Sequence, residues 1–281
     1  MLRAKGISRL SYAIMALLAA SMVVPFWSVL VTAFSTRFDS FQPGIHLWPV
    51  PWSVEGFGTL FSRIDFRLPF ANTLIVTAIG TALHVALATL GGFVLSQPGL
   101  PGRRLMGGII LLTLTIPSQV ILVPQFVLFR QLHLLNTLTA LIISDAVSAF
   151  SVLLMKTYFE QIPASVLEAA RMDGARQVRL VWDFYLPMAL PGVMTIAAFQ
   201  VVSRYNMFTE PLLFITAADK ITLQIALKSV VQGKDTVSTS DFIGPNAQMA
   251  GVVISILPLL IFYPLMQRYL VRGLTIGGVK G

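Results

Sequence analysis

The sequence predicts an all-α integral membrane protein with six transmembrane helices. Of its 281 residues 56% are hydrophobic and 11% are charged, and the mean hydropathy is +0.79. These values exceed those of ordinary soluble domains. Six apolar runs are also present, each long enough to cross a bilayer. Helices are expected rather than strands, because a helix satisfies all its backbone hydrogen bonds internally.

The six runs define one predicted transmembrane domain over the whole chain. In order, they cover residues 10–34, 71–95, 105–129, 138–155, 188–215 and 249–270. The first run follows basic residues, as a secretory signal does, but its length favours a retained anchor. A polar segment at 156–187 and a long loop at 217–248 separate the later runs, and residues 223–231 of that loop predict a short helix.

Basic residues are unevenly divided between the two sets of loops. The N-terminus, 97–104, 156–183 and the C-terminal tail hold twelve Lys and Arg against four acids, whereas the opposite set holds eight against seven. The positive-inside rule therefore predicts that both termini and the 156–187 segment are cytoplasmic. This charge pattern serves membrane insertion, and no nucleic-acid partner is predicted, since no basic cluster is interleaved with aromatic residues.

Metal chemistry is not predicted, because the chain has no cysteine and its three histidines lack the spacing of ligands. His84, on an apolar run, is expected to be a packing residue. No catalytic residue is predicted either. In particular, the phosphate-binding loop of ATPases is missing, since the one Gly-Lys pair, at Gly233 and Lys234, lacks that motif.

The polar segment at 156–187 predicts a helical hairpin. Ser165 and Glu168 fit a capping box that would begin the first helix. Gly174 suits the left-handed conformation that ends a helix, and the second helix is expected over 176–185, with Pro187 ending it. A hairpin held outside the membrane indicates a docking element. An interfacial helix is the alternative, but acidic side chains are poorly placed among anionic lipid headgroups.

Two groups of polar residues interrupt the apolar runs. Asp145 lies in the fourth run, and Ser144, Ser148 and Ser151 are expected to form a polar stripe beside it. This stripe fits either the lining of a solute path or an interhelical hydrogen bond. In the fifth run the polar and aromatic residues are Gln200, Ser203, Arg204, Tyr205, Asn206 and Glu210. Such groups suit sugars; alternatively, Arg204 extends to the outer headgroups or pairs with Glu210.

Several motifs carry a resemblance to a known family. Glu168-Ala169-Ala170, Asp173-Gly174-Ala175, Leu186-Pro187 and Pro191 resemble the EAA loop of ATP-binding-cassette (ABC) importer permeases. Asn72-Thr73-Leu74, Ile116-Pro117-Ser118-Gln119 and the tail 267–281 are similar to the carbohydrate-uptake branch. Within that branch, the chain resembles the smaller, six-span permease of a maltose-type importer. The resemblance implies the ABC type I importer permease fold, with a cytoplasmic coupling-helix hairpin.

The resemblance also implies partners and site residues. The ATPase-coupling residues would be Glu168, Ala169, Ala170, Arg171, Asp173 and Gly174, and the possible solute path would include Asp145, Ser148, Gln200, Arg204, Tyr205 and Asn206. The implied partners are a second permease in a heterodimer, two ATPase subunits that bind ATP and Mg, and an extracytoplasmic solute-binding protein near the 217–248 loop.

The implied function is import of a sugar or oligosaccharide across a bacterial cytoplasmic (inner) membrane, by a subunit that is not itself an enzyme. The tail 273–281 is similar to that of permeases for glycan fragments, which favours an oligosaccharide. A self-contained secondary carrier is the alternative function. It would need coupling-ion sites and an internal repeat, and only Asp145 fits the first requirement.

Overall fold

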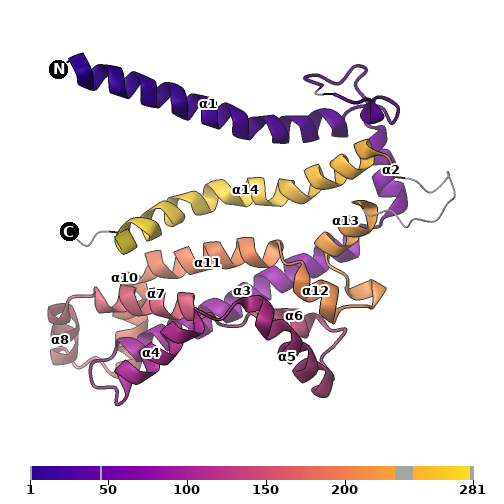
Figure 1. Cartoon of the computed structure of the whole chain (residues 1–281). Helices are drawn as coiled ribbons and strands as arrows, with labels where there is room; N and C mark the ends of the chain where they lie inside the picture. The colour runs from indigo at the N-terminus through magenta and orange to yellow at the C-terminus, as the bar shows by residue number, and fades with distance from the viewer. Residues whose placement is uncertain (1, 45, 232–242, 279–281) are drawn as a thin grey trace. The chain divides into compact units, whose positions relative to one another are not determined.

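A computed structural model describes residues 2–44, 46–231 and 243–278, and every regular element in these ranges is a helix (Figure 1). Three helices are long: α1 (Leu2–Ala33), α3 (Arg67–Ser96) and α14 (Pro245–Gly278). The shorter ones are η1 (Asp39–Phe41), α2 (Glu55–Arg63), α4 (Arg103–Thr113), α5 (Ser118–Gln131), α6 (Leu138–Ser144), α7 (Ala149–Glu160), α8 (Ala164–Met172), α9 (Gln177–Leu180), η2 (Val181–Tyr185), α10 (Leu186–Met188), α11 (Leu190–Tyr205), α12 (Thr209–Phe214), η3 (Ala218–Lys220) and α13 (Leu223–Val231). The all-α membrane fold is confirmed.

Three of the predicted spans are continuous and three are bent. Parts of α1, α3 and α14 are each long and apolar enough to cross a membrane alone. The other three spans are pairs of helices that are long and apolar enough only when taken together. They are α4 with α5, bent by 97°, α6 with α7, bent by 52°, and the stretch Val178–Met188 with α11, bent by 70°. One helix over 105–129 and one over 138–155 were expected, and both runs are broken instead. The fifth run likewise ends as a helix at Tyr205, and α12 is separate.

The first of these breaks has a local cause. Pro117 stands directly before α5, and a proline disfavours the helical conformation of the residue that precedes it. The helix end is closed by short-range bonds, including those from Thr115 N to the Leu112 carbonyl and from Ile116 N to the Thr113 carbonyl, both 3.2 Å or shorter. The α6–α7 break contains neither proline nor glycine and needs another explanation.

The chain divides into two compact units. The first combines residues 1–66 with 226–258. At its centre, Ala33 of α1, Leu60 of α2 and Ala250 of α14 are buried together. A Cβ added to Gly56 would lie 2.8 Å from the backbone of Asn246, so glycine allows α2 and the start of α14 to cross closely.

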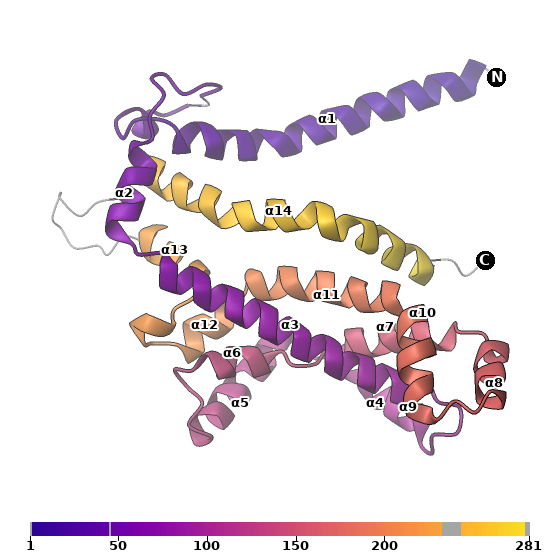
Figure 2. The same ribbon diagram turned by 180° about the vertical axis from the view of Figure 1, so that it is seen from behind.

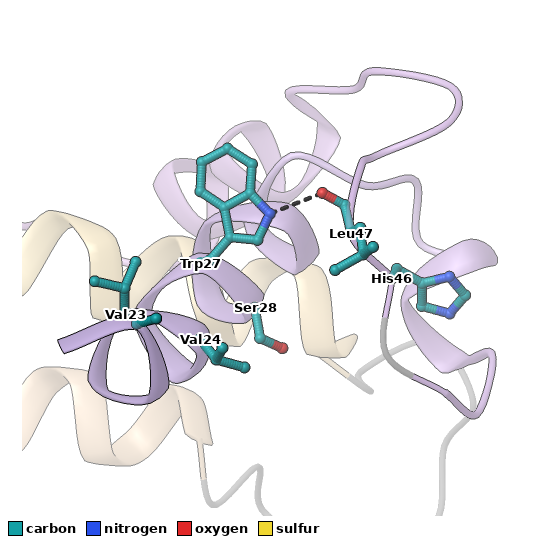
Figure 3. A pocket seen from close by; sticks show the side chains of 7 residues that line it. Val23, Val24, Trp27, Ser28, His46 and Leu47 are labelled. Atoms are coloured by element: carbon teal, nitrogen blue, oxygen red, sulfur yellow. Dashed lines mark hydrogen bonds between the residues drawn. The ribbon is translucent and has the colours of Figure 1, made fainter. Parts of the chain in front are cut away.

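The loop after α1 folds back on that helix within the first unit. Trp27 donates its indole N–H to the carbonyl of Leu47 at 2.7 Å (Figure 3). A cavity of about 310 Å³ lies beside this bond, lined mainly by apolar residues such as Val23 and Val24. Trp48 packs against both Trp27 and Trp52. Exposed tryptophans next to an apolar helix are typical of the membrane interface, and the cavity offers little polarity for a sugar.

The second unit combines residues 67–225 with 259–281, and α3 is its central helix. α7 and α11 pack along α3, as Figure 2 shows. Small residues permit these contacts. A Cβ on Gly92 would approach the backbone of Lys156 to 2.8 Å, and one on Gly192 would overlap the ring of Tyr158. This unit contains both groups of candidate site residues.

The loop at 217–248 lies only partly within the described residues. α13 covers Leu223–Val231, so the short helix predicted there is confirmed. Residues 232–242 lie outside the described ranges, and the predicted proximity of this loop to a solute-binding protein stays a prediction.

Candidate coupling hairpin and polar network

Residues 164–185 form a helical hairpin, named here the coupling hairpin. α8 ends in two capping bonds: Gly174 N donates to the Arg171 carbonyl and Ala175 N to the Ala170 carbonyl, both at 3.0 Å. Gly174 has a φ of +81°. This is the Schellman arrangement, in which glycine takes the left-handed position at no steric cost. The predicted role of Gly174 in the turn is confirmed.

The predicted start of the hairpin is wrong. α8 begins at Ala164 with Pro163 as its N-cap, and no side chain caps it. Pro163 occupies the N-cap position with φ −60° and ψ 130°, and its carbonyl accepts from Val166 N at 3.1 Å. Ser165 and Glu168 therefore lie inside the helix with exposed side chains.

The second arm of the hairpin also differs from the prediction. A single helix was expected over 176–185, but α9 is only one turn long and continues as the π-helical η2 and then as α10. The arm also extends one residue beyond Pro187, to Met188, and does not end before it.

Aromatic residues fix the hairpin to the spanning helices. Phe93 of α3, Phe159 of α7 and Tyr185 of η2 pack edge to face, with ring centroids 5.0 to 5.9 Å apart. These three residues are named here the aromatic base. Leu167 and Ala170 of α8 are buried in the same apolar cluster. The hairpin is therefore part of the core of its unit, and a force on it reaches α3 and α7 directly.

The other face of the hairpin is exposed and partly apolar. Four of the six predicted coupling residues, Glu168, Ala169, Arg171 and Asp173, have exposed side chains, whereas Ala170 is buried. Three large apolar side chains accompany them: Met172 is 89% exposed, Val178 69% and Trp182 64%. None of these three is among the predicted coupling residues, although apolar residues within a charged loop are a usable signal. A mixed apolar and charged face of this kind is typical of a protein-docking surface.

A second site surrounds the interruption between α6 and α7, named here the carbonyl break (145–148). Arg204 of α11 is buried and donates from Nη1 to the Leu141 carbonyl at 3.1 Å and from Nη2 to the Asp145 carbonyl at 2.6 Å. Gln200, one turn earlier on α11, donates to the Asp145 carboxylate at 2.5 Å. The guanidinium thus reaches carbonyls at both ends of the last turn of α6, where no further helical turn supplies backbone donors. The Ser144 hydroxyl also donates to the Leu141 carbonyl, at 3.0 Å.

Two further side chains complete the carbonyl break. His84 Nδ1 lies 2.8 Å from the Asp145 carbonyl and must donate to it, because a carbonyl oxygen only accepts. His84 Nε2 lies 2.8 Å from the Ser151 hydroxyl, and Gln125 donates to the Ser144 carbonyl at 2.8 Å. His84 was expected only to pack, and Gln125 was not selected. In the sequence, the signal that could have identified His84 and Gln125 is a lone polar residue within an apolar run.

Of the remaining predicted path residues, Ser148 joins this network through its side chain, because its hydroxyl donates at 3.0 Å to the Ser151 hydroxyl that contacts His84. Ser148 is the N-cap of α7 and accepts from Ser151 N at 3.2 Å, so the expected helical stripe of serines does not form. Tyr205 is buried, while Asn206 ends α11 and donates to the Val202 carbonyl at 3.0 Å. Of the six candidates, the structure brings Asp145, Ser148, Gln200 and Arg204 into this network.

The bundle of apolar helices and its exposed loop hairpin define a membrane permease. The profile of the family described as "binding-protein-dependent transport system inner membrane component" matches residues 88–276. The chain belongs to this family. Membership decides against the self-contained carrier, because permeases of this family work with a separate binding protein.

Curated relatives cover almost the full chain. A polygalacturonan/rhamnogalacturonan transport system permease of Bacillus subtilis is 29% identical over 97% of both chains. An arabinooligosaccharides transport system permease of Halalkalibacterium halodurans is 27% identical, over 95% of this chain and 94% of the relative. Both names describe permease proteins of transport systems, in agreement with the family.

Solved structures agree in fold. A chain of a bacterial ABC transporter involved in import of the acidic polysaccharide alginate superposes with a TM-score of 0.84 and 30% identity, over 94% of this chain and 96% of that one. A second chain, from an alginate transporter in complex with a pentasaccharide-bound periplasmic protein, gives a TM-score of 0.64 at 15% identity and supports the fold alone. The predicted importer permease fold is confirmed.

Proposed function

We propose that this chain is one of two permease subunits of an ATP-driven oligosaccharide importer, and that its coupling hairpin docks on a separate ATPase. The observation that carries the proposal is the hairpin itself: its turn is fixed, Leu167 and Ala170 are buried in the core, and its exposed side chains include Met172, Trp182 and Glu168. Large exposed apolar side chains on a rigid element are typical of a surface that binds another protein.

The hairpin can transmit motion because it is continuous with the bundle. Glu168 would hold the ATPase by charge-assisted hydrogen bonds, and the exposed Ala169 permits a close fit. Movement of the ATPase would then shift the aromatic base and, with it, α3 and α7. ATP and Mg are assigned to the ATPase, so this subunit would convert its closure into a change of the solute path.

The solute and the other partners follow from the relatives. Their names include polygalacturonan, rhamnogalacturonan and arabinooligosaccharides, which supports an oligosaccharide as the solute. A second permease would complete the path in a heterodimer, with the solute-binding protein outside and both termini in the cytoplasm of a bacterial inner membrane. Contacts at the carbonyl break favour a structural role for Arg204, since all the hydrogen bonds of its Nη atoms in the described chain go to backbone carbonyls.

Docking is tested by crosslinking, because the chain contains no cysteine of its own. A photoreactive thiol label is attached to Met172→Cys in the assembled transporter, and to Leu132→Cys as a control. Both native side chains are exposed, and Leu132 follows α5, remote from the hairpin. An ATPase adduct at position 172 and none at 132 is the expected result. A label at 172 that reacts only with lipid or with the second permease contradicts the docking.

The charge contact is tested in the same complex. Glu168→Ala is expected to reduce solute-stimulated ATP hydrolysis roughly tenfold or more, since a hydrogen bond to a charged group contributes about 1.5 to 3 kcal/mol. Glu160→Gln is the matched control, because that carboxylate already binds Arg103 and Lys156 within the chain. Equal stimulation in the wild type and Glu168→Ala would refute the role of Glu168.

A further inference from the structure

An open cavity of about 770 Å³ lies where α4 begins and α7 ends, and no role has yet been assigned to it. One side carries three cations, Arg103, Arg104 and Lys156. The other side is apolar and includes Leu111 of α4 and Leu153 of α7. A cavity with a cationic end and an apolar end suits a ligand that is itself divided into an anion and a hydrocarbon.

The cations exceed the acidic groups that face them. Glu160 binds both Arg103 and Lys156, the latter at 3.1 Å, and it is the carboxylate that the described contacts place here. Arg103 is further fixed by a bond of 2.7 Å from Nε to the Leu95 carbonyl. Arg104 forms no ion pair within the described part of the chain. Three cations against one carboxylate leave about two positive charges for a ligand.

The position of the cavity matches the boundary between hydrocarbon and water. Leu100, which lines it, packs against the apolar cluster that contains Leu167 of the coupling hairpin. α4, α7 and α8 lie at the same end of α3 (Figures 1 and 2). From this end α4 continues as an apolar helix, and Leu111 is 58% exposed. An anion would therefore sit at headgroup level, with apolar chains beside α4.

We propose that this cavity binds the phosphate of an anionic phospholipid through Arg103, Arg104 and Lys156, with the acyl chains along Gly107 and Leu111. Basic pockets between spanning helices on the cytoplasmic side suit such headgroups. The assignment to the cytoplasmic leaflet rests on the proposed function, because it follows the side of the coupling hairpin. The charge and apolar lining of the cavity do not depend on that assignment.

Two neighbouring glycines offer a steric test. A Cβ at either Gly107 or Gly108 would meet no atom within 4 Å, and neither has a positive φ, so both accept larger residues in α4. Only Gly107 lines the cavity. Gly107→Leu therefore fills the cavity without changing the charge, and Gly108→Leu is the matched control.

A charge test complements the steric one. Arg104→Gln removes the cation that has no ion-pair partner within the described residues. Arg179→Gln removes a cation on the coupling hairpin, which is exposed and paired with Asp183. Each cation near an anionic membrane surface contributes about 1 kcal/mol, so Arg104→Gln is expected to weaken lipid binding about fivefold.

The assembled transporter is delipidated, titrated with phosphatidylglycerol or phosphatidylcholine, and examined by native mass spectrometry. The expected result is preferential retention of phosphatidylglycerol, lost in Gly107→Leu, weakened in Arg104→Gln and unchanged in both controls. The proposal is overturned if the two lipids bind equally, or if Gly107→Leu retains as much phosphatidylglycerol as Gly108→Leu. Displacement of the lipid by millimolar inorganic phosphate would assign the cavity to a free anion and also overturn it.

The two proposals fail separately in these experiments. Lipid retention is read as bound mass and requires neither ATP hydrolysis nor solute. A transporter whose Met172→Cys label does not reach an ATPase still reports on the cavity. Conversely, a transporter that couples normally but shows no preference for phosphatidylglycerol refutes the lipid site alone.

Discussion

A methyl group added to Gly80 should disturb the carbonyl break from the opposite side. Gly80 lies on α3 beneath the guanidinium of Arg204, and a Cβ there would overlap Nη1 and Cζ and approach Nε to 2.7 Å. The guanidinium cannot simply rotate away, because both Nη atoms are bonded to carbonyls. Gly80→Ala should therefore force Arg204 out of its position.

The cost follows from the bonds that Arg204 makes. Displacing it removes two hydrogen bonds from a charged donor, one to the Leu141 carbonyl and one to the Asp145 carbonyl, at about 1.5 to 3 kcal/mol each. The Leu141 carbonyl keeps its bond from the Ser144 hydroxyl and the Asp145 carbonyl keeps its bond from His84, which limits both losses. Alanine regains about 1 kcal/mol of helix propensity over glycine. The net expectation is a destabilisation of about 2 to 4 kcal/mol.

Gly91→Ala on the same helix is the matched control. A Cβ there would lie 3.4 Å from the methyl groups of Val152, a contact that needs little adjustment. The assay is thermal unfolding of the purified complex in one detergent. Gly80→Ala should lower Tm by about 5 to 10 °C, and Gly91→Ala should leave it unchanged or raise it.

A double-mutant cycle checks the proposed cause. If alanine at position 80 acts through Arg204, then adding Gly80→Ala to an Arg204→Met variant should cost almost nothing further. The reasoning is refuted if Gly80→Ala and Gly91→Ala lower Tm equally. It is also refuted if Gly80→Ala costs as much in the Arg204→Met background as in the wild type.

Two further predictions concern turns. Gly174→Ala should destabilise the hairpin turn by about 1 to 2 kcal/mol, because φ is +81° there although a Cβ would meet nothing within 4 Å. Solute-stimulated ATP hydrolysis should fall in Gly174→Ala and be largely retained in Gly174→Asn, and equal activity of the two variants would contradict the backbone argument. Asn136→Ala should lower Tm, since Asn136 has a φ of 60° and its Oδ1 accepts from Thr216 N at 2.6 Å and from Ala217 N at 3.0 Å. Asn136→Asp keeps an acceptor and should lose less, so a larger fall in Tm for Asp than for Ala would count against these bonds.

Local features of the structure could be predicted from the sequence. The left-handed turn at Gly174 depends on a few neighbouring residues, and the helix at Leu223–Val231 depends on its own apolar periodicity. The membrane class depends only on hydropathy. Even so, the helix begins one residue before the predicted capping box of Ser165 and Glu168, with Pro163 as its N-cap, so a local motif did not fix the exact start of the helix.

The carbonyl break could not be predicted in the same way. Asp145 and the serines near it are the local mark in the run from 138 to 155, but a continuous helix with a polar stripe would carry the same residues. The backbone groups that the break exposes are satisfied by residues far away in the chain, His84 and Arg204, which lie 61 and 59 residues from Asp145. Inside a bilayer such a break is stable only where protein donors replace water. The sequence shows these donors only as isolated polar residues.

The same helix, α3, connects the two sites. Near one end Phe93 belongs to the aromatic base beneath the coupling hairpin, and near the middle Gly80 and His84 contact the carbonyl break. At about 1.5 Å per residue, the 13 residues from Gly80 to Phe93 span about 20 Å. Its one proline, Pro69, lies in the first turn, where it does not interrupt the hydrogen bonds of the helix. Under the proposed function, motion delivered to the hairpin would reach the carbonyl break as a displacement of this continuous helix, and the contacts of His84 with the Asp145 carbonyl and the Ser151 hydroxyl would draw α6 and α7 with it.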